Sequence, residues 1–268
     1  VFLVRYGYYD ITIKNKKMNT EKVEIENDYG KSDSFYFKVF NMESFSEYLR
    51  GHDLKKFFKY GKSISTEPVY FSIPKNINSR RQYKMPNLYS YMALNYYMCD
   101  QKKEFVDVFV SNKFSTSKFF NQLNFDYSTT QEISQTLLYG GVKKLYLDLS
   151  NFYHTLYTHS IPWMMTGKAE AKKDRKNGFA NTLDKLITSC QYDETHGIPT
   201  GNLLSRIIAE LYMCHFDKRM ENNNFIYTRY VDDVVFPFTL EAEKEDFLKE
   251  FSLICRENNL LVNDNKTR

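Results

Sequence analysis

Two adjacent carboxylates lie in a short break between two apolar runs late in the sequence. The segment is Ile226-Tyr-Thr-Arg-Tyr230-Val-Asp232-Asp233-Val-Val-Phe236. Because side chains alternate across a strand, the β-branched and aromatic residues on both sides predict a β-hairpin that presents Asp232 and Asp233 at its turn. Carboxylate oxygens are hard ligands of the kind that Mg²⁺ prefers. The segment therefore predicts a magnesium site.

A third aspartate ends another apolar run, which begins at Val142. This run predicts a strand that ends at Asp148, and the aromatic pair Phe152-Tyr153 follows after three residues. A single aspartate at a strand end is commonly a turn residue. Asp148 gains chemical importance only if the fold brings it beside the Asp-Asp hairpin.

A turn between these two acidic segments contains both glycine and proline. The sequence His196-Gly197-Ile-Pro199-Thr200-Gly201-Asn202 runs directly into an apolar segment, 203–216, that predicts a helix. Glycine lets backbone approach a ligand closely, and a helix start offers free amides to a phosphate. A turn before a helix is common, so this pattern alone leaves a simple connection equally open.

Cations cluster after an expected strand at 69–74. Lys75, Arg80, Arg81 and Lys84 lie in a short polar segment that a pair of strands can present together. Clustered cations on a hairpin bind phosphates well. A solvated surface loop is the alternative interpretation.

The composition sets broader limits. A formal net charge of +4 and a pI near 8.6 permit a nucleic-acid partner without demonstrating one. No apolar run approaches the roughly 20 residues that span a bilayer, so no membrane partner is expected. The four cysteines show no Cys-x-x-Cys spacing, which is typical of a reduced cytoplasmic protein without a zinc site or disulfide framework.

The order of these motifs resembles the palm of right-handed polymerases, and in particular the reverse transcriptase family. Tyr230-Val-Asp232-Asp233 resembles the third motif of that family, and Asp148 with Phe152-Tyr153 resembles the first. The glycine turn at 197–201 resembles the second motif. Ile73-Pro74-Lys75, followed by Arg81 and Pro86, is similar to the basic fingers motif of bacterial reverse transcriptases, so the resemblance covers residues 69–268.

The resemblance implies an α+β fold, the fingers and palm of a right-hand polymerase, built from an antiparallel sheet with packed helices. It implies an amino-terminal arm and helix at 1–63, fingers at 64–138 and a palm at 139–268. No thumb is expected within this segment. A carboxy-terminal helical domain is expected beyond residue 268.

The family's chemistry is phosphoryl transfer assisted by two Mg²⁺ ions, for which Mn²⁺ can substitute. The resemblance implies that Asp148, Asp232 and Asp233 hold these ions together with the backbone carbonyl of Leu149. Lys266 is placed like the lysine proposed to protonate the leaving pyrophosphate.

The resemblance also implies a nucleotide site. Lys75 and Arg81 would hold the triphosphate of an incoming deoxynucleotide, and Thr200 and Gly201 would line its site. Tyr153 matches the position where a bulky ring excludes a ribose 2′-hydroxyl. Thr200 stands where templated reverse transcriptases generally carry Gln, the residue that lines the nascent base pair, so its shorter side chain weakens the case for template reading.

The amino-acid sequence of the first two motifs is similar to that of the corresponding motifs in the AbiK-type abortive-infection reverse transcriptases of bacteria. That resemblance implies a cytoplasmic, homo-oligomeric protein of phage defence that makes DNA without a template. Synthesis would be primed on a protein tyrosine, so single-stranded DNA would be attached covalently to the chain. Among 22 tyrosines, Tyr29 occupies the favoured position, in a polar turn that leaves its hydroxyl accessible.

Two alternatives stay open. One is a templated, RNA-directed DNA polymerase. The other is a catalytically silent palm that binds nucleic acid or oligomerises, although a scaffold has no need of three carboxylates at Asp148, Asp232 and Asp233.

Overall fold

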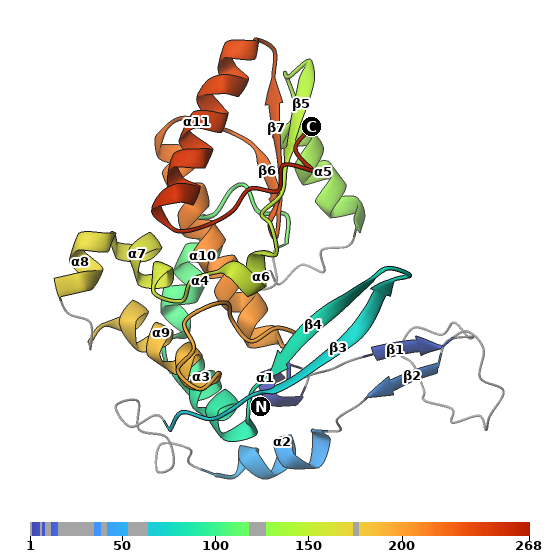
Figure 1. Cartoon of the computed structure of the whole chain (residues 1–268), viewed down its shortest axis with the longest axis vertical. Helices are drawn as coiled ribbons and strands as arrows, with labels where there is room; N and C mark the ends of the chain where they lie inside the picture. The colour runs from blue at the N-terminus through green and yellow to red at the C-terminus, as the bar shows by residue number, and fades with distance from the viewer. Residues whose placement is uncertain are drawn as a thin grey trace.

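The computed structural model describes residues 2–5, 7–8, 12–15, 35–38, 42–52, 64–117, 127–173 and 177–268. The elements of these ranges are shown in Figure 1. In chain order they are α1 (Phe2–Arg5), β1 (Thr12–Asn15), β2 (Phe35–Lys38), α2 (Glu43–Arg50), β3 (Val69–Asn76), β4 (Ser79–Met85), α3 (Leu88–Asp100), α4 (Lys102–Ser111), α5 (Tyr127–Leu137), β5 (Lys143–Leu147), α6 (Phe152–Thr155), α7 (Ser160–Thr166), α8 (Lys168–Lys173), α9 (Phe179–Ser189), α10 (Leu203–Asn222), β6 (Thr228–Tyr230), β7 (Asp233–Phe238) and α11 (Glu241–Glu257).

A three-stranded antiparallel sheet in the order β5-β7-β6 forms the carboxy-terminal part of the fold. The central strand β7 alternates as a half-buried strand should, with Val234, Phe236 and Phe238 buried. Helix α11 packs on this strand, and its Phe247 ring stacks on Phe236 with centroids 4.0 Å apart. The aromatic residues of this region therefore fix the sheet against its helix.

Helix α10 connects this sheet to the helices below it, α3, α4, α7 and α9 (Figure 1). Residues are buried on all sides of α10, as expected for a helix in the middle of a domain. The Tyr- and Met-rich segment 88–98 lies in α3, and Tyr91, Leu94 and Tyr97 belong to the same core. No helix in the described part of the chain combines the length and apolar character needed to cross a bilayer.

Strands β3 and β4 form a separate antiparallel hairpin that projects from the helical part (Figure 1). Its base is tied to the loop before α10. Lys84 forms an ion pair with Glu194 at 2.6 Å, and its Nζ also donates to the carbonyl of His196. The expected fingers hairpin is thus present and anchored to the glycine-containing loop.

The α+β fold with antiparallel sheets and packed helices is as the sequence predicts, but two local expectations differ. The pattern at 115–123 predicts a helix; of these residues the structure describes only 115–117, which run alongside β6, where Ser115 forms a parallel bridge with Arg229. The apolar segment 260–262 forms an isolated bridge between Val262 and Leu149 instead of a strand. In both places, backbone hydrogen bonds to a distant segment replace the local pattern.

Phe247→Ala tests the packing of α11 on the sheet. Phe247 is fully buried, so truncation leaves a cavity and should lower the free energy of unfolding by about 3–5 kcal/mol. Val142→Ala, at a side chain that is 79% exposed, is the control and should cost less than about 0.5 kcal/mol. Urea denaturation measures both, and equal effects would contradict this packing.

Candidate functional site

The Asp-Asp hairpin is confirmed. Tyr230 at the end of β6 pairs with Asp233 at the start of β7, so Val231 and Asp232 form a two-residue turn. Val231 has a φ of 58°, in the left-handed region that β-branched residues rarely adopt. The Asp232 side chain is half-buried, and that of Asp233 is exposed.

The register of β5 on β7 brings Asp148 to the same end of the sheet. Leu147 pairs with Val234, and continuing the antiparallel ladder by one residue places Asp148 opposite Asp233. Directly opposed residues in such a ladder have Cβ atoms about 4.5–5.5 Å apart. The sheet therefore brings together three carboxylates, two of them separated from the third by more than eighty positions in the sequence.

The Asp148 carboxylate is buried and doubly hydrogen-bonded. Lys266 Nζ donates to its Oδ2 at 2.6 Å, and Asn263 Nδ2 donates to its Oδ1 at 2.8 Å. Burial alone would raise the pKa of Asp148, but these two contacts lower it below the ordinary value. Asp148 is therefore ionised at neutral pH, and Lys266 supplies the opposing charge.

The hairpin carboxyls have the opposite electrostatic character. Burial, followed by the charges of Asp148 and Asp233, raises the pKa of Asp232 to about 6. Although the Asp233 side chain is exposed, partial desolvation of its carboxyl and a hydrogen bond with the Asp148 carboxyl raise the pKa of Asp233. Burial is the largest cause for both groups, and the nearby charge of Asp148 adds to it in each, so a negative charge on either hairpin carboxyl is disfavoured here.

These residues fit a divalent cation. Their oxygens are hard ligands, and a bound cation would relieve the repulsion that raises the pKa of Asp232. The bridge between Leu149 and Val262 is made by backbone groups of Asp148 and Ser150, so within the described part of the chain no backbone donor engages the Leu149 carbonyl. Among the described residues, no group of three or more His, Cys, Asp or Glu side chains has the geometry to hold a metal ion. Lys266 occupies one Asp148 oxygen, and its side chain is 59% exposed and has room to leave.

Tyr153 follows Asp148 in the chain and lies within electrostatic range of Asp232. Burial raises the pKa of its hydroxyl to about 12, opposed by the charge of Arg206 and reinforced by that of Asp232. The ring contacts Phe152 edge-on, with centroids 5.6 Å apart. The half-buried ring therefore stays neutral and lies within electrostatic range of Asp232.

The glycine turn packs on the segment that follows Asp148. Gly197 has a φ of 76°, and a Cβ there would come within 2.7 Å of the His154 carbonyl, so no other residue fits. Ile198 N donates to the carbonyl of Tyr153 at 2.9 Å. The turn thereby fixes the backbone of the Tyr153 segment, and exposed Gly201 follows with a φ of 101°.

The structure turns Thr200 toward the fingers hairpin. Its hydroxyl donates to the Gln82 carbonyl and accepts from Lys84 N, both at 3.2 Å. The side chain is buried in this position. Thr200 therefore ties the palm to β4.

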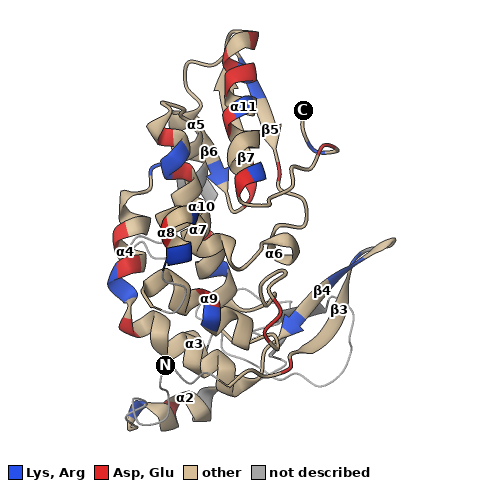
Figure 2. Ribbon diagram, turned by 60° about the vertical axis from the view of Figure 1, so that its left-hand side comes forward, with Lys and Arg blue, Asp and Glu red and all other residues tan. Residues whose placement is uncertain are grey.

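Lys75 and Arg81 are exposed on the β3–β4 hairpin, where basic residues are coloured along β4 in Figure 2. Arg81 pairs with Ile73, and Lys75 lies where the register shifts. Among the described residues, no ion pair or hydrogen bond joins either cation to the three aspartates. Tyr29 lies outside the described residues.

Asn263 is a site residue that the motifs do not predict. Its side chain donates to Asp148, and its backbone N donates to the Asp148 carbonyl at 2.8 Å. Asn263 and Lys266 therefore hold Asp148 from one short segment. The spacing of three residues, which places both side chains on one side of a turn, is the signal that the sequence offered.

The pKa of Asp232 gives a test of the charge concentration. Between pH 3.8 and about 6 the folded chain keeps the Asp232 proton and the unfolded chain releases it, so stability falls as pH rises through this range. A tenfold difference in proton affinity between the folded and unfolded chains corresponds to about 1.4 kcal/mol. In buffer without divalent cations, Asp232→Asn should reduce this fall, measured by urea unfolding at several pH values.

The exposed Asp246 on α11 provides the matched control. Asp246→Asn should leave the pH dependence of stability unchanged. An identical pH profile for wild type and Asp232→Asn would show that Asp232 ionises as it does in water.

Comparison with known proteins places the chain among polymerases. The family model for reverse transcriptase (RNA-dependent DNA polymerase) matches residues 118–268, which is more than half of the chain. The match includes all three aspartates and Lys266. No curated protein matches the sequence significantly.

Solved structures show a similar fold. The apo telomerase from Candida tropicalis has a TM-score of 0.52 at 15% identity, covering 99% of this chain and 52% of the telomerase. Telomerase from Candida albicans in complex with a fragment of telomeric RNA gives 0.47 at 14% identity, covering 88% and 47%. The chain thus spans about half the length of these proteins. With the family match over its carboxy-terminal part, the chain belongs to the reverse transcriptase family.

Proposed function

We propose that this chain carries the fingers and palm of a nucleotidyltransferase that polymerises deoxynucleotides. The observation that carries the proposal is the meeting of Asp148, Asp232 and Asp233 at one end of the β5-β7-β6 sheet. Raised pKa values at two of these groups indicate a place that is short of positive charge. Membership of the reverse transcriptase family supplies the reaction class.

Asp148, Asp232, Asp233 and the Leu149 carbonyl would hold two Mg²⁺ ions, which neutralise charge that develops as a phosphoryl group is transferred; Mn²⁺ would substitute. Lys266 Nζ donates to Asp148 Oδ2. From this position its ammonium would serve as a proton donor for the departing pyrophosphate.

Other residues would bind and select the nucleotide. Lys75 and Arg81 carry exposed positive charge for its triphosphate. The Tyr153 ring, held against Phe152 and near Asp232, would fill the space that a ribose 2′-hydroxyl needs. Gly201, exposed at a positive φ before α10, lets the chain pass close to the sugar or base.

Synthesis is proposed to be untemplated. Support comes from Thr200, whose short side chain stands at the position of the glutamine of templated relatives and engages β4. A side chain committed to the fingers in this way offers no long polar group to a base pair. The alternative, an RNA-directed copying enzyme, is favoured by the family description itself.

The similarity of motif wording to AbiK-type proteins supports the remaining proposals. These are priming on a tyrosine, with Tyr29 as the nucleophile, attachment of the single-stranded product to the protein, homo-oligomer formation, and phage defence in the bacterial cytoplasm. The proposed division is an amino-terminal part at 1–63, fingers at 64–138 and palm at 139–268.

Mass spectrometry of the protein after incubation with Mg²⁺ and deoxynucleotides tests nucleotidyl transfer and priming together. A tyrosine-linked nucleotide is expected in the wild type and in Asp246→Asn. Asp232→Asn should lower incorporation by at least about a hundredfold, because the neutral amide lacks the negative charge with which the carboxylate binds a divalent cation. Tyr29→Phe should remove the linked nucleotide.

Template use is measured in the same reaction. Addition of poly-rA with oligo-dT should leave the use of all four deoxynucleotides unchanged. Efficient incorporation restricted to dTTP would instead identify a templated enzyme. No incorporation by the wild type under either condition would contradict nucleotidyl transfer.

Tyr153→Ala tests sugar selection. Removal of the ring should raise the efficiency of ribonucleotides relative to deoxynucleotides by about tenfold or more, because one excluded hydroxyl contact is worth a few kcal/mol. Tyr153→Phe keeps the ring and should keep the preference. Comparison of kcat/KM for dATP and ATP decides, and equal ratios in all three proteins would refute the role of Tyr153.

A further inference from the structure

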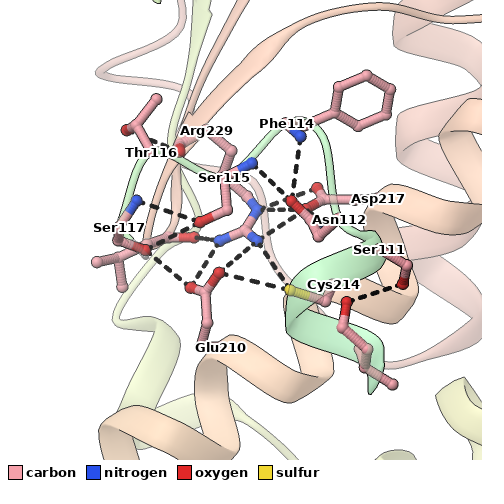
Figure 3. Close-up of polar contacts among 12 residues, drawn as sticks. Ser111, Asn112, Phe114, Ser115, Thr116, Ser117, Glu210, Cys214, Asp217 and Arg229 are labelled. Carbon is pink, nitrogen blue, oxygen red and sulfur yellow. Dashed lines mark hydrogen bonds and ion pairs between the residues drawn. The ribbon is translucent and has the colours of Figure 1, made fainter. Parts of the chain in front are cut away.

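A fully buried arginine lies three residues before Asp232, at the middle of β6. Figure 3 shows its guanidinium between Glu210 and Asp217 of α10. Its Nε donates to Asp217 Oδ1 at 3.0 Å, and its Nη2 donates to Asp217 Oδ2 at 2.7 Å and to Glu210 Oε1 at 3.0 Å. Hydrogen bonds to two carboxylates of one helix therefore hold the Arg229 side chain in one orientation.

Each carboxylate has further donors from elsewhere in the chain. Asn112 Nδ2 donates to Asp217 at 2.7 Å, and Ser117 Oγ donates to Glu210 at 2.9 Å. Tyr227 Oη donates to Asp217 at 2.5 Å. These contacts fill the acceptor sites that remain when two carboxylates face a single guanidinium, so each carboxylate oxygen of the cluster has at least one donor.

The backbone of Arg229 is fixed as well. Its N donates to the Phe114 carbonyl at 2.9 Å, and its carbonyl accepts from Thr116 N at 2.8 Å. The segment 112–117 thus borders β6 and also supplies Asn112 and Ser117 to the carboxylates. Helix α10 therefore holds the side chain of Arg229, and this segment holds its main chain.

One hydrogen bond of the guanidinium reaches outside the carboxylate cluster. Arg229 Nη1 donates to the carbonyl of Val231 at 2.8 Å, inside the turn that carries Asp232. Val231 has a φ of 58°, which a β-branched residue adopts only at a cost. A fixed donor at its carbonyl offsets part of this cost and orients the following peptide.

A buried ion cluster is weak evidence for a role in stability, because desolvation of the charges offsets their attraction. The geometry that it fixes is a better guide to its use. We propose that Arg229 is a positioning residue that transmits the rigidity of α10 to the Val231-Asp232 turn, so that Asp232 and Asp233 face Asp148 in the arrangement that cation binding needs. This inference rests on the proposed function and assigns to it a residue that contacts neither nucleotide nor cation.

The role requires arginine in particular. Its planar fork reaches Asp217, Glu210 and the Val231 carbonyl simultaneously, through separate nitrogens. Lysine keeps the charge but has one nitrogen, which cannot hold all three acceptors in their places. Arg229→Lys therefore keeps a positive charge between Glu210 and Asp217 but removes the set of hydrogen bonds that connects α10 to the Val231 carbonyl.

The test compares Arg229→Lys with Tyr227→Phe. Tyr227→Phe removes a hydrogen bond from the same buried cluster and leaves the contact between Arg229 and Val231 in place. Urea unfolding, Mn²⁺ affinity by electron paramagnetic resonance, and kcat and KM for a deoxynucleotide are measured for each protein, at a temperature where both variants are folded.

Arg229→Lys is expected to lower Mn²⁺ affinity by about tenfold and kcat by about ten- to a hundredfold, with KM changed less than about threefold, because displaced ligands act on the reacting centre and not on nucleotide binding. Tyr227→Phe should stay within about threefold of wild type in all three, even if it is equally destabilised. The proposal would be overturned if Mn²⁺ affinity and kcat fell in both variants in proportion to their loss of stability. It would also be overturned if Arg229→Lys left Mn²⁺ affinity and kcat unchanged.

Glu210→Gln covers the case in which Arg229→Lys does not fold. Glu210→Gln keeps Arg229 and the shape of the residue 210 side chain, but it weakens the hydrogen bonds that Arg229 Nη1 and Nη2 donate to that side chain. It should therefore lower Mn²⁺ affinity and kcat, as Arg229→Lys does. Unchanged values in a folded Glu210→Gln would refute the positioning role. If the wild type binds Mn²⁺ but transfers no nucleotide, the proposed function fails, and the difference in Mn²⁺ affinity still decides on Arg229.

Discussion

The register of β5 on β7 is the constraint on which the candidate site depends. The pairing of Leu147 with Val234 sets Asp148 opposite Asp233, and a slip of one residue would turn every side chain of β5 to the other face. Register is maintained by burial on one face, where Leu145, Leu147 and Phe236 enter the core. The apolar packing of the sheet thereby determines the positions of its charged residues.

Charge is arranged in two layers around the turn of the hairpin. On the outer side, Lys266 and Asn263 hold Asp148 in its ionised form while the pKa of Asp232 stays high. On the inner side, the Arg229 guanidinium pairs with the carboxylates of Glu210 and Asp217, whose oxygens also accept hydrogen bonds from Ser117 and Asn112. The inner layer is fully paired and rigid, whereas the outer layer is short of positive charge and accessible at Lys266. This contrast separates the groups that support the site from those available for chemistry.

Much of the fold and the centre of the site follow from local patterns. The Asp-Asp hairpin, the strand before Asp148 and the helix after the glycine turn each have a period or turn signal that the structure confirms. The contacts between distant elements have no such signal. Asn263 and Asp148, for example, lie 115 positions apart, and no local pattern predicts their hydrogen bond. Glu210 and Asp217, two helical turns apart in a buried helix, were a signal for the Arg229 cluster. The direction of Thr200 depended on how the fingers hairpin docks, which no single segment specifies.

The central claim is that Asp148, Asp232 and Asp233 form the cation site of a nucleotidyl-transfer centre. Anomalous diffraction from crystals grown with Mn²⁺ and a deoxynucleoside triphosphate tests it most directly. The account predicts Mn²⁺ bound by these three carboxylates, with Lys266 moved off Asp148 and the nucleotide phosphates on the same ions. Mn²⁺ absent from the carboxylates, with Lys266 still paired to Asp148, would contradict it.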